Sequence, residues 1–367
     1  MSVQVSYKKQ FLIYILLGII VIASVEGLVR GYEFLFLNCP LTDYDVYSEL
    51  NYFYVRQICL DFRYLTFIEP DVVQLKPNQH FMSINVNNDG FRGPEITLEK
   101  PNNTYRIFAV GGSTTMGHAA TSDEATWPAF LEEKFKDENL GINVEVVNAG
   151  INGAYSFSET YHIRDNILKF DPDLIINYGG VNDADVWVEN PQIKTAKEIE
   201  EEYGGFKFKN YPFYRTPFMI FTIFFADDYK EKAFPPKTNP HDKVLEAWKS
   251  RWINLCEETN EKGIKNLIIV QAALGTGNKK ILSPDEIRNY PSSNHDLEFL
   301  RILDSMAGEL NEISITCHNT GDLRNIFDDV SQPIYWDAYH TADVGNKIIA
   351  EEIFELSLPI VLEDIKK

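Results

Sequence analysis

The sequence predicts a three-layer α/β/α domain with a mostly parallel, five-stranded sheet, preceded by an apolar helix. Three observations support this fold class: short apolar runs typical of buried strands, helical segments that alternate with them, and Gly- or Asn-bearing turns where three of the runs end. Such an alternation indicates a sheet with helices on both faces, in which ligands bind at the carboxyl ends of the strands.

The first element is the apolar N-terminal segment. Residues 11–25 carry no charged side chain, Lys8 and Lys9 precede them, and mostly acidic residues follow. This charge asymmetry predicts a single-pass topology with a cytoplasmic N terminus and an extracytoplasmic remainder. No clean small-x-small cleavage site follows, so the pattern favours an uncleaved signal-anchor over residues 1–30 rather than a cleaved signal peptide.

An accessory region is expected over residues 31–103, as short strands and loops rich in aromatic side chains. It contains several turn signals, including the stretch from Asn88 to Gly93. The main domain is expected over residues 104–362, with an insertion at about 186–242. An aromatic segment of this insertion, at 211–225, would form a wall of the substrate pocket or a lid, or would pack onto the domain.

The elements of the main domain follow in order along the chain. Strands are expected at 106–110, 144–147, 173–178 and 265–270, and a fifth near 313–317. Helices are expected at 127–135, where Thr126 would provide the cap, and at 158–170, 243–262, 297–310 and 344–356.

Composition excludes some functions. The 367 residues carry a formal net charge of −20, a field that repels nucleic acid and anionic lipid headgroups. The four cysteines form no CxxC pair, which argues against a thiolate zinc site or a thioredoxin-like motif. They could form two disulfides outside the cytoplasm or remain small buried thiols.

Two motifs together suggest nucleophilic catalysis. Ser113 follows Gly111-Gly112 directly after the first strand, an arrangement that alone is typical of a plain turn. Asp337 and His340 stand three residues apart just before the last helix. A serine nucleophile needs a general base, and an imidazole base needs an acceptor that fixes its tautomer. One Asp-x-x-His turn beside Ser113 would supply both.

Two further motifs could supply an oxyanion hole, which needs backbone N–H groups and side-chain amides aimed at the developing charge. Asn148-Ala149-Gly150-Ile151-Asn152-Gly153 follows the second strand, and Gly180-Val181-Asn182-Asp183 follows the third. Asp183 is expected to fix the turn that holds Asn182. His118, five residues after Ser113, is expected to be a bystander.

These four motifs, in this order, resemble the blocks of the SGNH (GDSL-like) hydrolase superfamily, whose fold is flavodoxin-like. The resemblance covers about residues 105–356, with Gly112 where the commoner pattern has Asp. It implies Ser113 as the nucleophile, His340 as the base and Asp337 as its partner. It also implies an oxyanion hole of Ser113, Gly153 and Asn182. The Asn88–Gly93 turn more loosely resembles larger extracytoplasmic members.

The expected function is therefore serine-dependent hydrolysis of a carboxylic ester, as an acyl or acetyl esterase or a lipase-like enzyme. The substrate would be a small-molecule or glycan-borne ester, and no cofactor, metal or nucleic acid is required. Two alternatives stay open: an O-acyltransferase acting on a surface glycan, and an anchored binding protein that has lost catalysis. The sequence does not indicate the acyl group, the alcohol or the oligomeric state.

Overall fold

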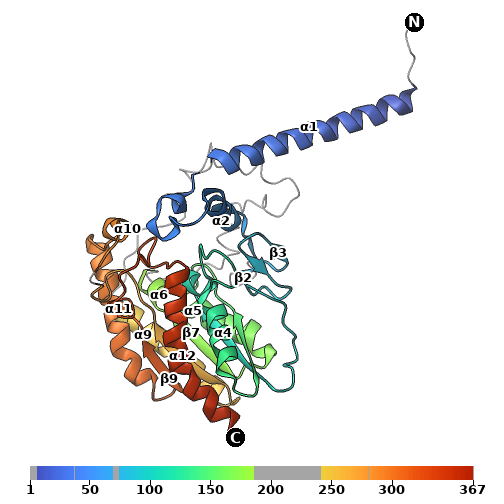
Figure 1. Cartoon of the computed structure of the whole chain (residues 1–367). Helices are drawn as coiled ribbons and strands as arrows, with labels where there is room; N and C mark the ends of the chain where they lie inside the picture. The colour runs from blue at the N-terminus through green and yellow to red at the C-terminus, as the bar shows by residue number, and fades with distance from the viewer. Residues whose placement is uncertain (1–5, 37, 69–73, 186–240, 280, 367) are drawn as a thin grey trace. The chain divides into compact units, whose positions relative to one another are not determined.

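The computed structural model describes residues 6–36, 38–68, 74–185, 241–279 and 281–366 (Figure 1). These residues divide into two compact units. One contains the N-terminal helix, and the other begins at Pro40 and contains the remaining described elements. An insertion was expected at about 186–242, and its residues 186–240, which include the aromatic segment 211–225, lie outside the described residues.

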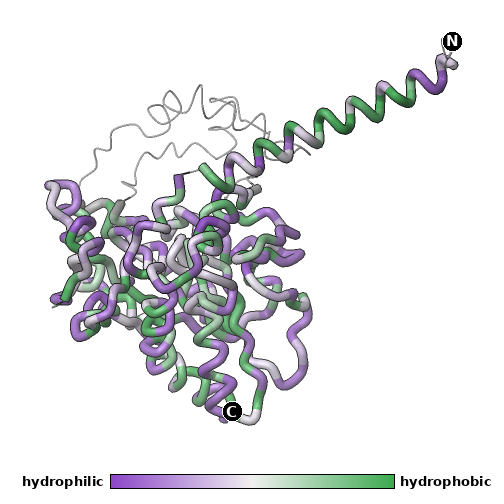
Figure 2. The backbone as a smooth tube through the Cα atoms, turned by 45° about the horizontal axis from the view of Figure 1, so that its top comes forward, coloured by the Kyte–Doolittle hydropathy of each residue, from purple (hydrophilic) through white to green (hydrophobic). Residues whose placement is uncertain are grey.

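The N-terminal helix α1 runs from Tyr7 to Phe36 and is apolar along most of its length (Figure 2). Its 30 residues span about 45 Å, enough to cross the roughly 30 Å hydrocarbon core of a bilayer. An 18-residue window within it has a mean hydropathy of 2.5, and 6% of that window is buried. A signal sequence would pass the same test, so length and composition alone do not distinguish a signal from an anchor.

The second unit is built on a five-stranded sheet in the order β6-β5-β7-β8-β9, with every neighbouring pair parallel. The strands are β5 (Thr104–Gly111), β6 (Asn143–Asn148), β7 (Leu174–Gly179), β8 (Lys265–Val270) and β9 (Asn319–Asp322). This order corresponds to 2-1-3-4-5, so the chain reverses direction across the sheet between β5 and β7. The predicted fold class is confirmed.

Helices cover both faces of the sheet because side chains alternate along each strand. On β5, Phe108 and Val110 point into a core shared with α9 (His241–Asn260), α11 (Asn294–Ile313) and the turns that follow α5 (Ser156–His162). Ile107 and Ala109 point into the opposite core, which is shared with α4 (Trp127–Glu138) and α12 (Asp343–Ile365). Buried side chains thus cover the sheet on both faces, and the sheet can position residues at its carboxyl edge.

Short elements connect these layers. They are η1 (Pro40–Asp43), η2 (Asp45–Tyr47), α2 (Tyr52–Tyr64), β1 (Phe67–Ile68), β2 (Gln74–Leu75), β3 (Gln79–His80), β4 (Asn85–Val86), α3 (Ser113–Met116), η3 (Ile163–Ile167), η4 (Leu168–Phe170), α6 (Val181–Asp185) and α10 (Pro284–Arg288). Two of the pairs are antiparallel, β1 with β2 and β3 with β4.

The fifth strand was predicted in the wrong place. The apolar residues at 313–317 close α11 and the turn after it: Ile313 and Cys317 are buried on one helical side, while Ile315 is 83% exposed. The strand is β9, a short edge strand of polar residues and one glycine. An edge strand is not buried on both faces, so it needs no apolar run and leaves little signal in the sequence.

The accessory region and two helix ends also differ from expectation. Residues expected as strands and loops contain the helix α2, which Asn51 caps by accepting a bond from the Phe53 N–H. The helix expected at 158–170 begins at Ser156 and passes through one π turn and one 3-10 turn. Thr126 stands at the N-cap of α4, but its hydroxyl donates to the Asp123 carbonyl instead of accepting from the helix.

The cysteines are all disulfide-bonded. Cys256 of α9 pairs with Cys317, and Cys39 and Cys59 are likewise oxidised. Disulfides persist in oxidising compartments and are rare in the cytosol. Together with the apolar N-terminal helix, as signal or anchor, they suggest an extracytoplasmic location.

Candidate active site

The predicted site residues gather at the carboxyl edge of the sheet, around the ends of β5 and β7. This edge is the switch point of the fold, where loops from neighbouring strands diverge and leave room for a ligand. Ser113 follows β5 and opens α3, and Asn182 follows β7 in α6. His340 is separated from Ser113 by 227 positions in the chain, yet the two side chains are in direct contact.

The turn that carries Ser113 is closely enclosed. The N–H groups of Gly117 and His118 both donate to the Ser113 carbonyl, at 2.9 and 2.8 Å. A Cβ atom on Gly111 would collide with the Thr115 side chain, and one on Gly150 would collide with the Met116 backbone. These two glycines therefore let β5 and the loop after β6 approach the nucleophile turn, which holds it in one place.

Three side chains form a continuous hydrogen-bonded series. The His340 Nε2 atom lies 2.7 Å from the Ser113 Oγ atom, and the His340 Nδ1 atom lies 2.6 Å from an Asp337 carboxylate oxygen. An ionised carboxylate only accepts hydrogen bonds, so Nδ1 carries the proton and Nε2 can accept the serine hydroxyl hydrogen. Ser113 is half-buried and His340 is 9% exposed.

Asp337 is held in its ionised form. Burial on its own would raise the pKa of this carboxyl group, but the adjacent imidazole and the hydrogen bonds to the carboxylate outweigh burial and lower the pKa below its ordinary value. The bonds come from the His340 ring and from the backbone N–H groups of Tyr339 and His340, the latter two at 3.0 and 2.7 Å. The backbone of this turn thus holds the Asp337 carboxylate in place, and the carboxylate in turn orients the His340 ring.

Asn182 and the loop that carries Gly153 lie next to Gly112, the residue before Ser113. The Asn182 amide packs directly against Gly112, where a Cβ atom would collide with it, and donates to the Ala154 carbonyl at 2.6 Å. An amide nitrogen carries two hydrogens, so it can also donate to a second acceptor. Gly153 precedes Ala154 and adopts a left-handed conformation with φ of +74°, which favours glycine.

The buried carboxylate of Asp183 joins the two donor loops. Asp183 accepts bonds from the Ser156 N–H at 2.9 Å and from the Ser156 hydroxyl, joining the turn that carries Asn182 to the start of α5. Burial raises the pKa of Asp183 to about 6, against the opposing bonds from Ser156. Burial also raises the pKa of the neighbouring Glu159 well above its ordinary value, with the Asp183 charge as a second cause. Asp183 thus lies where the sequence analysis expected it, fixing the Asn182 turn.

Aromatic rings surround the imidazole of His340. Trp336 stacks on it with ring centroids 5.0 Å apart and planes 9° apart, and His118 lies at 5.1 Å. The ring of Phe62 in α2 lies 4.5 Å from the His118 ring, between centroids. Burial, followed by the nearby His340, lowers the pKa of His118 to about 3, so this ring is neutral at ordinary pH.

The structure thus brings Ser113, Asp337 and His340 into contact and sets Asn182 and the Gly153 loop beside them. His118, expected to be a bystander, lies against the His340 ring. The sequence analysis missed Trp336 and Phe62, which stand in no motif. It gave no role to Arg92, although this residue lies in the Asn88–Gly93 turn that it singled out. Within the described residues, no group of His, Cys, Asp or Glu side chains could hold a metal ion.

Part of the chain matches a known protein family, and its structure is similar to several solved structures. Residues 109–230 match the model of the GDSL-like Lipase/Acylhydrolase family. The chain is similar to the crystal structure of AlAXEase, an acetyl xylan esterase, with 16% identity over 68% of this chain and 98% of that chain, at a TM-score of 0.42. It is also similar to LAE5, an alpha/beta hydrolase enzyme from the metagenome of Lake Arreo, Spain. The identity is 12% over 68% of this chain and 94% of that chain, at a TM-score of 0.42. A third similar structure is a catalytic mutant of Axe2, an acetylxylan esterase from Geobacillus stearothermophilus. The identity is 12% over 69% of this chain and 93% of that chain, at a TM-score of 0.41.

No significant match is found among curated proteins. The family match starts within β5 and includes the Ser113, Gly153 and Asn182 motifs. Over residues 109–230, the chain is therefore similar to the GDSL-like Lipase/Acylhydrolase family.

Proposed function

We propose that this protein is a serine-dependent hydrolase of carboxylic esters. The observation that carries the proposal is the series of two short contacts from Asp337 through His340 to Ser113. Its order and tautomer are those a serine nucleophile requires. Neutral His118 also supports it, because a charged ring 5.1 Å away would oppose the positive charge that His340 gains during the reaction.

In the proposed reaction, His340 Nε2 takes the hydroxyl proton as Ser113 Oγ attacks the ester carbonyl. The carbonyl oxygen becomes an oxyanion, which the N–H groups of Ser113 and Gly153 and the Asn182 amide would stabilise. His340 then gives its proton to the departing alcohol, which leaves an acyl group on Ser113. A water molecule, deprotonated by His340, releases the acid and restores the serine.

The experiment uses the full-length chain in detergent and measures hydrolysis of p-nitrophenyl acetate, longer-chain esters and acetylated xylan. Ser113→Ala is expected to lose activity by about 10³-fold or more, because removing the nucleophile of a catalytic triad leaves only the residual catalysis of the site. It should also lose labelling by a fluorophosphonate probe. Ser314→Ala, an exposed serine whose hydroxyl bonds to the Asn311 carbonyl, is the matched control and should behave as wild type.

The outcomes separate the alternatives. Activity that survives Ser113→Ala would contradict the assignment. Absence of both turnover and labelling in the wild-type protein would favour an anchored binding protein. Turnover that rises on addition of a glycan acceptor, with the acyl group found on that acceptor, would favour an O-acyltransferase using the same serine.

We also propose that α1 is an uncleaved membrane anchor, with the second unit on the extracytoplasmic side. The supporting observations are the Lys8-Lys9 flank, the apolar length of α1 and the disulfide-bonded cysteines.

A further inference from the structure

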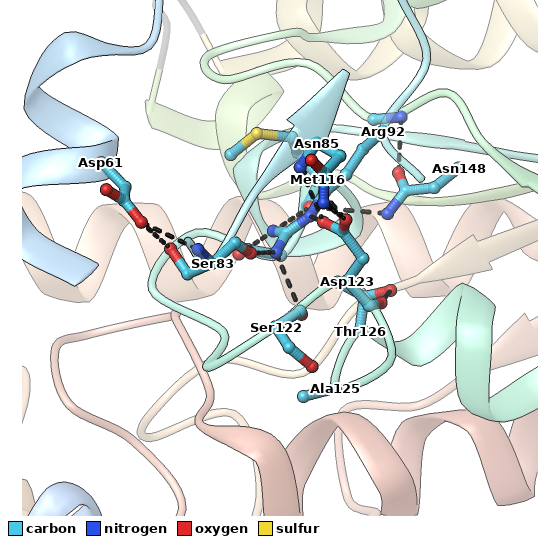
Figure 3. Close-up of polar contacts among 12 residues, drawn as sticks. Asp61, Ser83, Asn85, Arg92, Met116, Ser122, Asp123, Ala125, Thr126 and Asn148 are labelled. Carbon is cyan, nitrogen blue, oxygen red and sulfur yellow. Dashed lines mark hydrogen bonds and ion pairs between the residues drawn. The ribbon is translucent and has the colours of Figure 1, made fainter. Parts of the chain in front are cut away.

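The turn-rich stretch from Asn88 to Gly93 has no part in the proposed reaction, yet it sends one side chain to the nucleophile turn. The side chain is Arg92, and 1% of its surface is exposed. Its guanidinium group donates to four backbone carbonyls and one carboxylate (Figure 3), which are Met116 at 2.9 Å, Gly117 at 2.7 Å, Ser83 at 2.7 Å, Ser122 at 3.0 Å and Asp123 at 2.8 Å.

This set of acceptors matches the donors of an arginine. A guanidinium group carries five N–H donors in a fixed planar fork, and five acceptors surround it. A buried charge is tolerated only when it is paired and fully hydrogen-bonded, and Asp123 supplies the opposite charge. Lysine has three donors on a single nitrogen, so it could not satisfy the same acceptors.

Two of the five acceptors belong to the turn that carries the nucleophile. Met116 ends α3, and Gly117 follows it in the left-handed conformation that closes this helix. A helix of four residues is too short to hold its own conformation. Because Ser113 is its first residue, the bonds from Arg92 to its last carbonyls fix the direction in which the serine is presented.

Arg92 is itself held by the region before the main domain. The Asp123 carboxylate accepts bonds from the backbone and side-chain N–H groups of Asn85. Ser83, another acceptor of the guanidinium, is anchored through its N–H and hydroxyl groups to Asp61 of α2. A chain of polar contacts therefore runs from α2 to the end of the nucleophile turn (Figure 3).

We propose that Arg92 is a positioning residue that holds the Ser113 turn in its reactive orientation. The segment from Ser83 to Gly93 thereby becomes part of the catalytic machinery, rather than an accessory to it. The kinetic consequence rests on the proposed ester hydrolysis, whereas the structural consequence, a turn held closed by Arg92, does not.

The test compares Arg92→Lys with Arg106→Lys in the full-length protein. Arg106 is equally buried but bonds to Glu145 and the Phe170 carbonyl at the opposite end of β5. Arg92→Lys is expected to lower kcat by about 10- to 100-fold while KM changes less than about threefold, because a displaced nucleophile impairs the chemical step. Fluorophosphonate labelling should slow in parallel, and amide hydrogen exchange in residues 112–118 should accelerate.

Arg106→Lys should lower the thermal midpoint without changing kcat, labelling or exchange in residues 112–118. The proposal is overturned if Arg92→Lys loses stability but keeps wild-type kcat and exchange, as a merely structural arginine would. If Arg92→Lys does not fold, Asp123→Asn decides by the same two readouts. If the wild-type protein has no esterase activity, the proposed function fails, and hydrogen exchange alone decides the role of Arg92.

Discussion

At the scale of single residues, the turn that carries Ser113, the proposed nucleophile, depends on a small residue beside it. Gly112 occupies the position where the commoner pattern of the resembling family has Asp. The structure gives a reason, since the Asn182 amide fills the space that any side chain at 112 would need. The backbone of Gly112 has a φ of −79°, which other residues adopt readily, so space rather than strain requires glycine here.

This packing predicts the effect of Gly112→Ala. The added methyl group should displace the Asn182 amide and remove one donor from the proposed oxyanion hole, lowering kcat by about 10²- to 10³-fold. Asn182→Ala should lower kcat by a similar factor. The double variant should then be little worse than either single one, because both changes remove the same interaction.

Steady-state kinetics of the three variants with p-nitrophenyl acetate check this prediction. Losses that multiply in the double variant would show that Gly112 and Asn182 act independently, which the packing does not allow. Circular dichroism of each variant serves as the control for folding.

At the scale of elements, the strands that are buried on both faces were easier to predict from the sequence than the more exposed elements. Strands β5, β7 and β8 are buried on both faces and therefore appear in the sequence as apolar runs, and β8 was predicted at the residues where it lies. The edge strand β9 and the helix α2 carry no such run and were missed. The contacts of Arg92 could not be predicted either, because four of its five acceptors are backbone carbonyls, which every residue possesses.

The motifs of the site were easier to predict than its surroundings, for a related reason. The proposed reaction requires a serine, a histidine and a carboxylate, so Ser113, Asp337 and His340 stand out by residue type wherever the chain places them. Trp336 and Phe62 are contacts of the imidazole and of His118, and an aromatic residue in a sequence does not reveal its neighbour. Only the folded sheet edge shows that α2 packs against a ring beside the base.

The element α1 carries a prediction of its own. If it is an uncleaved anchor, intact-mass measurement of the membrane-purified protein should retain residues 1–30, and alkaline carbonate should leave the protein in the membrane pellet. A helix with this apolar length partitions stably into a bilayer. A mature N terminus beyond residue 25, with the protein in the supernatant, would instead identify the segment as a cleaved signal peptide.

At the scale of the whole molecule, the sheet brings together residues that are far apart in the sequence. Residues from three loops and the turn before α12 meet at one edge because parallel strands present their carboxyl ends together. The same tight cores bury titratable groups away from the site, among them His162 of α5, which is 3% exposed. Burial, with the nearby Lys169 as a second cause, lowers the pKa of His162 to about 4 despite the opposing charge of Asp165.

This burial predicts an acid sensitivity of the fold. Between pH 6.5 and about 4 the unfolded chain protonates this histidine and the folded chain does not, so stability from this group is complete above pH 6.5 and is lost as the pH falls. The shift corresponds to about 3 kcal/mol. His118 acts in the same direction, whereas Asp183, with its raised pKa, acts in the opposite direction over about pH 4 to 6.

The pH ranges in which these three groups titrate overlap, so the dependence of wild-type stability on pH does not isolate His162. A comparison with His162→Phe does. Phenylalanine keeps a ring beside Phe91 and gives up the bond from Asn166, a loss that does not depend on pH. The free energy of unfolding, measured in urea at pH 7 and pH 4, should therefore fall about 3 kcal/mol less in the variant than in the wild type. Parallel losses in the two proteins would mean that folding does not lower the pKa of His162, and that water reaches this side chain in the folded state.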